Sequence, residues 1–223
     1  MLNIKLVLCY NGKRYSGFQS QKNQAVKTVC NELMKALEAL YKQPIKVIGA
    51  GRTDAGVHAM GQVVSYRVKT EIPDSKIAQA LNSFLPSDIY VRSAESVDLN
   101  FNALHSAVSR EYQYLFSTEE IPLYYSDIIV PFRYRLDFSE FNELKDLLIG
   151  EHDCSGFECT GSNKSSPIKT IYKISLDTVI QSCLYGMKPV CYYKLSIEAN
   201  SFLYRMVRNV MGAMLEVFRG KRS

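Results

Sequence analysis

The sequence predicts an α+β protein built from two tandem ferredoxin-like, or RRM-like, halves. Strand and helix patterns follow one another in the order β-α-β-β-α-β over residues 4–97, and the second part of the chain repeats most of this order. Only the stretch 101–109 separates the two parts, so we expect one continuous, mostly antiparallel sheet with helices on one side. The expected domains are residues 1–105 and 106–223.

Each element of the first half follows from a local pattern. Residues 4–10 alternate between two sets of side chains, which is the period of a strand, and Asn11-Gly12 indicates a turn at its end. Apolar residues spaced three and four apart over 26–40 predict a helix, and Pro44 follows its end. By the same two periods we expect strands over 45–48, 63–68 and 89–97 and a helix over 77–85.

The second half follows the order β-α-β-β-α and has no closing strand. We expect strands over 110–117, 170–179 and 190–198 and helices over 138–148 and 201–219. Because the final strand is missing, a neighbouring strand is left with an exposed edge unless another segment covers it.

The overall composition is that of a globular protein. The chain has 223 residues, of which 47% are hydrophobic and 22% charged, and these values exclude collagen, coiled coil and disorder. No stretch approaches the roughly 20 apolar residues that a membrane helix needs. The start of the chain lacks the basic leader and cleavage site of a signal peptide. We therefore expect a cytoplasmic protein with no membrane partner.

The six cysteines favour neither a disulfide scaffold nor a metal site. They are too sparse for a disulfide framework, so we expect them to be reduced. His152, Cys154 and Cys159 lie close together in the sequence and suggest zinc, but they lack the paired C-x2-C spacing. Buried thiols beside a loop are the favoured interpretation, and we expect no metal.

Positive charge is concentrated at both ends of the chain. Residues 1–111 carry 14 basic and 9 acidic side chains, residues 112–200 carry 8 and 12, and residues 201–223 carry 5 and 1. Basic ends suit an anionic polymer such as a nucleic acid. Solvated basic faces without a partner explain the same charges, and charge alone favours this second interpretation.

The most informative segment is the glycine-rich loop 49–59. It lacks both the Gly-Lys-Ser/Thr of a P-loop and the G-x-G-x-x-G spacing of dinucleotide folds. Its glycines surround Arg52-Thr53-Asp54, which places one guanidinium beside one carboxylate. Arg52 could keep Asp54 ionised and oriented. Alternatively, the Asp54 side chain only caps the turn, and composition alone favours that cap.

The string Gly-Ala-Gly-Arg-Thr-Asp-Ala-Gly-Val-His-Ala over residues 49–59 resembles the signature of the tRNA pseudouridine synthase A family. Six further segments resemble parts of this family in the right order, so the resemblance extends over nearly the whole chain. They are residues 10–12, 17–21, 81–89, 109–114, 151–153 and 199–212.

The resemblance implies an isomerase that converts uridine to pseudouridine at positions 38, 39 and 40 of the tRNA anticodon stem-loop. It also implies a homodimer that needs no metal or organic cofactor, with an active-site cleft between the halves. Asp54 matches the catalytic aspartate of the family, and attack on C1′ and addition to C6 of the ring both stay open. A uridine in a stem must leave the base stack before it can react.

The resemblance also assigns roles to other residues. Arg52 matches the arginine that fills the space left by the flipped base and pairs with the aspartate. Tyr112 matches the active-site tyrosine, which either stacks on the base or accepts a proton from C5. Arg110 shares a strand face with Tyr112 and is expected to bind substrate. By the same resemblance Leu203 packs against the base, and Arg208 reaches a phosphate or the catalytic carboxylate.

One position departs from the family pattern, and two other functions compete with catalysis. Leu104 stands where the family usually carries an arginine. A non-catalytic tRNA-binding module or chaperone with the same fold is the alternative, but binding alone does not require a carboxylate at Asp54. A scaffold without an RNA partner is disfavoured by the basic ends of the chain.

Overall fold

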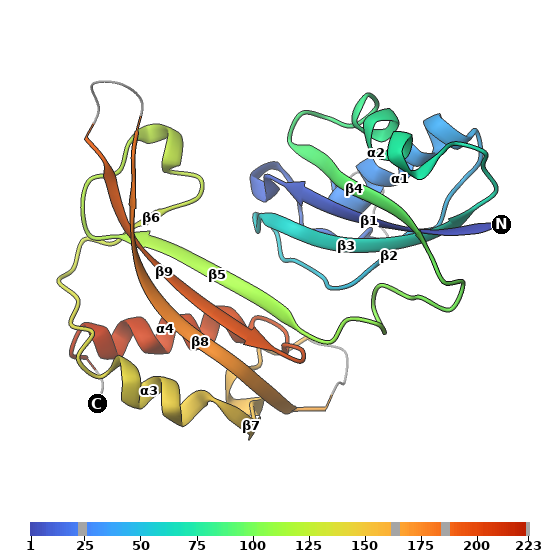
Figure 1. Cartoon of the computed structure of the whole chain (residues 1–223). Helices are drawn as coiled ribbons and strands as arrows, with labels where there is room; N and C mark the ends of the chain where they lie inside the picture. The colour runs from blue at the N-terminus through green and yellow to red at the C-terminus, as the bar shows by residue number, and fades with distance from the viewer. Residues whose placement is uncertain (22–25, 162–165, 184–187, 222–223) are drawn as a thin grey trace. The chain divides into compact units, whose positions relative to one another are not determined.

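A computed structural model describes residues 1–21, 26–161, 166–183 and 188–221. The chain divides into two compact units, Met1–Ala107 and Val108–Ser223 (Figure 1). Each unit has its own sheet, two α-helices and a hydrophobic core. The protein is therefore of the α+β class, as predicted.

The first unit contains a four-stranded antiparallel sheet in the order β2-β3-β1-β4. Both helices cover one face of this sheet (Figure 1). The other face, which we call the open face, carries no helix in the described part of this unit, and the segment after β4 covers only the part of it around Asn3 and Ser65. The element order along the chain is the β-α-β-β-α-β that the sequence predicts. The elements are β1 (Leu2–Tyr10), α1 (Val29–Tyr41), β2 (Ile48–Gly49), β3 (Ala59–Val68), α2 (Asp74–Asn82) and β4 (Ile89–Val97).

Several expected boundaries in this unit were wrong. Strand β3 begins earlier than expected, and α2 lies three residues earlier in the chain. The first helix begins at Val29 because Thr28 is its N-cap, and the Thr28 hydroxyl accepts a hydrogen bond from the Asn31 amide at 3.2 Å. The strand expected over 45–48 is reduced to Ile48–Gly49. Its apolar signal has another cause, since Ile45 is buried in the core without belonging to a strand.

The second unit contains a five-stranded sheet in the order β6-β5-β9-β8-β7. Figure 1 shows its two helices on one face of the sheet, where α4 supplies much of the core. The final helix begins later than expected, because Arg205 before it has a left-handed backbone with a φ of 59°. The elements are β5 (Arg110–Ser117), β6 (Val130–Pro131), α3 (Phe141–Leu148), β7 (Gly150–Asp153), β8 (Ile168–Gln181), β9 (Val190–Ala199) and α4 (Met206–Phe218).

The described strands pair as two sheets, in place of the one continuous sheet that was expected. All ladders lie within a unit, and they end at β2 and β4 in the first and at β6 and β7 in the second. The missing final strand was expected to leave a neighbouring strand with an exposed edge or with another segment over it, and the outer edge of β5 is covered in part by such a segment. Val130 and Pro131 pair in parallel with Phe116 and Ser117. A strand of two residues that contains proline is too short to show the alternation of side chains typical of a strand, so the sequence did not predict it.

The described residues contain neither a membrane-spanning helix nor a group of three potential metal ligands. No helix in the described ranges is long and apolar enough to cross a bilayer. All six cysteines are free. Cys154 is buried, and burial raises the pKa of its thiol. The ring of His152 lies 3.1 Å from the Ile149 carbonyl oxygen, and the Cys159 amide donates to the Tyr204 carbonyl oxygen.

Candidate active site

The glycine-rich loop runs from the end of β2 to the start of β3, and hydrogen bonds with β3 hold its first residues. The Ala50 amide donates to the Val63 carbonyl oxygen at 2.8 Å. The Gln62 side-chain amide donates to the Gly51 carbonyl oxygen at 2.5 Å. Strand β3 thus supplies both a backbone and a side-chain partner for the first residues of the loop, and it fixes where the loop leaves the sheet.

The segment after β1 packs directly on this loop, and two glycines make the contact possible. A Cβ added to Gly12 would lie 1.9 Å from the Val57 carbonyl oxygen. A Cβ added to Gly17, whose φ is +93°, would lie 2.4 Å from the Thr53 carbonyl oxygen. The Phe18 amide donates to that same Thr53 oxygen at 3.1 Å. The loop therefore depends on a neighbouring backbone that any larger residue would push away.

Asp54 lies in the middle of this loop and is half-buried, whereas Arg52 is exposed. The Val57 amide donates to the backbone carbonyl oxygen of Asp54 at 3.2 Å, so the turn is closed without the carboxylate. Thr53 is tied to β1, because its hydroxyl oxygen lies 2.9 Å from the Tyr10 hydroxyl. The structure thus brings Arg52 and Asp54 into one fixed loop. A direct contact between their side chains stays a prediction.

A second layer of side chains, which the sequence analysis missed, supports the loop. The Tyr15 hydroxyl donates to one oxygen of Asp88 at 2.6 Å, and Arg14 donates to the other oxygen at 2.6 and 3.0 Å. The Tyr15 carbonyl oxygen in turn accepts from the Gly56 amide at 3.1 Å. Asp88 lies in the segment 81–89 that carries the family resemblance, and this was the available signal.

The ionisation of this network follows from its contacts. Burial, and then the hydrogen bond to Asp88, raise the pKa of Tyr15 above its usual value. Burial acts to raise the pKa of the Asp88 carboxyl as well, but the hydrogen bonds from Tyr15 and Arg14 outweigh it. The pKa of Asp88 therefore lies below its usual value of 3.8. The carboxylate stays charged at neutral pH and keeps both partners in place.

In the second unit, two predicted residues lie on β5. Tyr112 is half-buried, and its ring meets the ring of Phe202 edge-on with centroids 5.2 Å apart. Arg110 donates to the Asn200 carbonyl oxygen at 2.9 Å. Both contacts join β5 to the turn after β9, so this turn positions the two side chains. Phe116, further along the strand, is fully buried in the core.

The other two predicted residues lie at the start of the last helix. Leu203 is only 5% exposed, and its carbonyl oxygen accepts from the Met206 amide at 3.1 Å. Arg208 is exposed on α4. Burial raises the pKa of Tyr114, and the positive charge of Arg208 acts in the opposite direction. A contact between Arg208 and the substrate stays a prediction.

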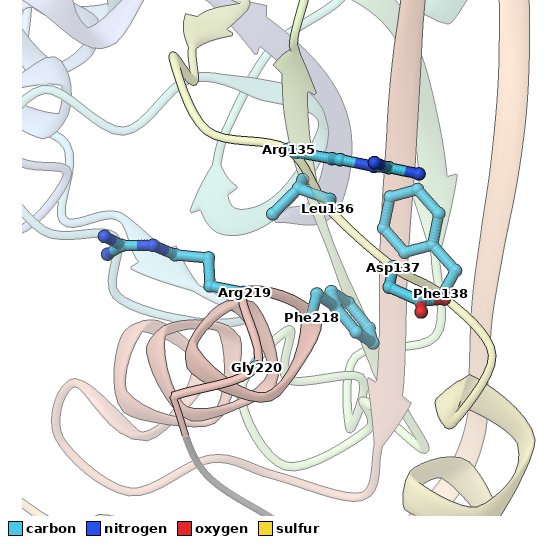
Figure 2. Close-up of a pocket in the computed structure, with 7 residues that line it drawn as sticks. All are labelled: Arg135, Leu136, Asp137, Phe138, Phe218, Arg219 and Gly220. Atoms are coloured by element: carbon cyan, nitrogen blue, oxygen red, sulfur yellow. The ribbon is translucent and has the colours of Figure 1, made fainter.

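A hollow elsewhere in the second unit contains none of the predicted residues. It has a volume of about 430 Å³. Figure 2 shows that its lining comes from the end of α4 and from the segment before α3. Beside it, the Arg219 guanidinium lies 3.6 Å from the centre of the Tyr134 ring. The lining residues are Arg135, Leu136, Asp137, Phe138, Phe218, Arg219 and Gly220.

Comparison with known proteins agrees with the resemblance seen in the loop. The sequence profile described as tRNA pseudouridine synthase matches residues 7–105 and 145–223. The chain belongs to the tRNA pseudouridine synthase family. It is therefore a tRNA pseudouridine synthase, which is an isomerase. The matched ranges include Asp54 and α4, whereas Arg110 and Tyr112 fall in the unmatched stretch between them.

Individual tRNA pseudouridine synthases A match over almost the whole chain. The protein from Thermoanaerobacter sp. (strain X514) is 36% identical over 222 residues, which are 99% of this chain and 86% of that protein. The protein from Thermosipho africanus is 37% identical with the same coverage. The protein from Oenococcus oeni is 36% identical over 230 residues, covering 100% of this chain and 85% of the relative. These alignments extend across β5 as well.

Proposed function

We propose that this pseudouridine synthase acts on uridines 38, 39 and 40 of the tRNA anticodon stem-loop and that Asp54 is its nucleophile. The observation that supports Asp54 is its place in the loop. It is the only carboxylate of the segment 49–59, and it is half-buried on a backbone that Gly12, Gly17 and Tyr15 position. Such a carboxylate is oriented before substrate binds, and this lowers the cost of reaching a reactive geometry.

The reaction needs one carboxylate and no water. The N1–C1′ bond breaks, the uracil turns, a C5–C1′ bond forms, the proton leaves C5, and N1 gains a proton. Asp54 either bonds to C1′ or adds to C6, and in both routes the carboxylate is regenerated when product forms. One carboxylate is enough because the base is kept and rejoined. Base flipping, at a cost of a few kcal/mol, precedes these steps.

The remaining predicted residues have supporting roles in this proposal. Arg52, exposed beside the nucleophile, fills the space that the flipped base leaves and pairs with Asp54. Tyr112 stacks on the base or takes the C5 proton. Arg110, Leu203 and Arg208 bind substrate. The proposal also includes a homodimer, and light scattering on the purified protein would measure its mass.

The test is the conversion of unmodified tRNA, followed by mapping of carbodiimide-resistant uridines by primer extension. We expect pseudouridine in the anticodon arm with the natural protein and none with Asp54→Asn, while affinity for tRNA is retained. Asp146→Asn makes the same chemical change on the exposed side of α3 and serves as the matched control. Equal product from Asp54→Asn would refute the nucleophile. Binding of tRNA without product by the natural protein would favour the non-catalytic alternative.

A further inference from the structure

The open face of the first sheet carries an exposed aromatic residue at the end nearest the catalytic loop. Tyr90 on β4 is 55% exposed, whereas its neighbours Ile89 and Val91 are 3% and 1% exposed. Side chains alternate between the two faces of a strand, and Ile89 and Val91 point into the core under α1 and α2. The Tyr90 ring therefore lies on the face that no helix of this unit covers (Figure 1).

Strand register places Met60 level with Tyr90 on the other side of β1. Cys9 pairs with Tyr90 on β4, and Tyr10 pairs with Ala59 on β3. Met60 follows Ala59 and is 76% exposed. The side chains of Met60 and Tyr90 thus flank the last residues of β1 on its two sides.

Arg92 connects the two flanking strands. Its guanidinium donates to the Met60 carbonyl oxygen at 2.9 Å. Because β1 lies between β3 and β4, the Arg92 side chain must extend over β1 to make this bond. The side chain is exposed, so it lies on the open face. We call Met60, Tyr90 and Arg92 together the strand-end platform.

The platform adjoins the catalytic loop within the same unit. Strand β3 begins at Ala59, directly after the loop that carries Asp54. Strand β1 ends at Tyr10, whose hydroxyl contacts Thr53. Strand β3 therefore continues the loop, and strand β1 contacts it, so the platform and Asp54 belong to neighbouring parts of one unit.

We propose that the strand-end platform binds a nucleotide of the tRNA next to the target uridine. This proposal rests on the function proposed above. An exposed tyrosine ring offers a stacking surface for a base of any sequence. The Arg92 guanidinium has five N–H donors, of which the bond to Met60 uses one, so others remain for a phosphate. The thioether of Met60 adds a polarizable contact beside the ring.

Charge favours RNA as the occupant. Residues 1–60, which include the loop and β1, carry nine basic and three acidic side chains. On the open face, Arg67 and Arg92 each donate to a backbone carbonyl oxygen, which is a neutral partner. The nearby carboxylate of Glu95 is paired with Lys5. A polyanion with stackable bases complements this surface.

The first test measures the affinity of the full-length protein for unmodified tRNA by filter binding at fixed salt. We expect Tyr90→Ala to weaken binding about tenfold, because loss of one base–aromatic stack has an effect of this order. Tyr90→Phe keeps the ring and should bind like the natural protein. Tyr172→Ala removes a similarly exposed strand tyrosine in the second unit and is the matched control. Unchanged binding by Tyr90→Ala would overturn the proposal.

A second measurement separates phosphate contact from stacking. Arg92→Gln should lower the slope of log affinity against log salt by about one, which is the effect of one lost phosphate contact. Tyr90→Ala should leave that slope unchanged, because stacking releases no counterion. An unchanged slope for Arg92→Gln would contradict the phosphate contact.

These binding assays test the platform separately from the role of Asp54 as the nucleophile. If the natural protein forms pseudouridine but Tyr90→Ala binds tRNA normally, the platform is refuted and the proposed function stands. If Tyr90→Ala binds weakly but the anticodon arm is never modified, the proposed function fails and the platform remains an RNA contact. Thermal unfolding of each variant verifies that the fold is intact, as expected for exposed side chains.

Discussion

In the first unit, Arg52 and Asp54 lie on a loop, whereas in the second unit Tyr112 and Arg208 lie on a strand and a helix. The loop is positioned by close backbone approaches at Gly12 and by hydrogen bonds from the segment after β1. The residues of the second unit are positioned by aromatic and apolar packing. We therefore expect substitutions in the two units to impair function in different ways. In the first unit they displace the backbone of the loop, and in the second they weaken the packing of the core.

The largest expected effect is that of Gly12→Ala. The new Cβ would lie 1.9 Å from the Val57 carbonyl oxygen, so the loop must move. Misplacement of a catalytic group by about 1 Å reduces rate by about 100-fold. We expect a loss of kcat of this order, measured by single-turnover conversion of tRNA. Gly156→Ala, where a Cβ meets nothing within 4 Å, should be unaffected. Equal rates for the two variants would contradict a backbone-positioned loop.

In the second unit, Leu203→Ala should act on stability. Leu203 is buried against the core that α4 completes, and removal of a buried leucine side chain costs about 2–5 kcal/mol. We expect a loss of about 3 kcal/mol in the free energy of unfolding, measured by urea denaturation. Leu123→Ala, at an exposed position, should change it by less than about 0.5 kcal/mol. An unchanged free energy of unfolding for Leu203→Ala would contradict its place in the core of the second unit.

A smaller effect is expected from Asp88, which holds the side chains that support the loop. Asp88→Asn removes the charge and replaces one of the two acceptor oxygens by an NH2 group, so Tyr15 and Arg14 cannot both keep their acceptor, at a cost of about 1–3 kcal/mol at pH 7. Because folding lowers the pKa of Asp88, its contribution is complete above the unfolded pKa and is lost as the pH falls through the folded value. The difference between Asp88→Asn and the natural protein should therefore shrink below about pH 4.

A surface ion pair in the second unit provides the contrast for this pH dependence. Asp177 lies 3.2 Å from Lys194, and their side chains are 50% and 33% exposed. Exposed pairs contribute about 0–1 kcal/mol, so Asp177→Asn should have a small effect at both pH values. Urea denaturation at pH 7 and pH 3 compares the two variants. A constant difference for Asp88→Asn between these pH values would contradict its lowered pKa.

Several elements could be predicted from the sequence because the pattern of side chains that indicates them lies within the element itself. Strand β4 begins at Ile89 and ends at Val97, and β5 covers Arg110–Ser117, as the alternation of side chains predicted. The glycine-rich loop that we propose to be catalytic was recognised from its glycines and from the motif around Asp54. The strand expected over 45–48 failed because Ile45 and its neighbours are apolar for burial in the core rather than for pairing.

The contacts that support the loop could not be predicted in this way. Tyr15 and Asp88 are 73 residues apart, and neither has a local pattern that indicates its partner. Arg92 and Met60 are 32 residues apart, and they meet only because β1 lies between their strands. A sequence pattern reports which way a side chain faces within its own element, but not which distant element lies opposite.

By itself, the sequence determined the α+β class, most strand and helix positions, the family and the residues expected to carry the chemistry. These depend on the identity of residues within one short segment. Only the tertiary structure decided the strand order, the support of the loop by Tyr15 and Asp88, the close approach at Gly12 and the strand-end platform. The physical reason is that such contacts form when the chain brings distant segments together, and their geometry is fixed by the packing of the whole unit.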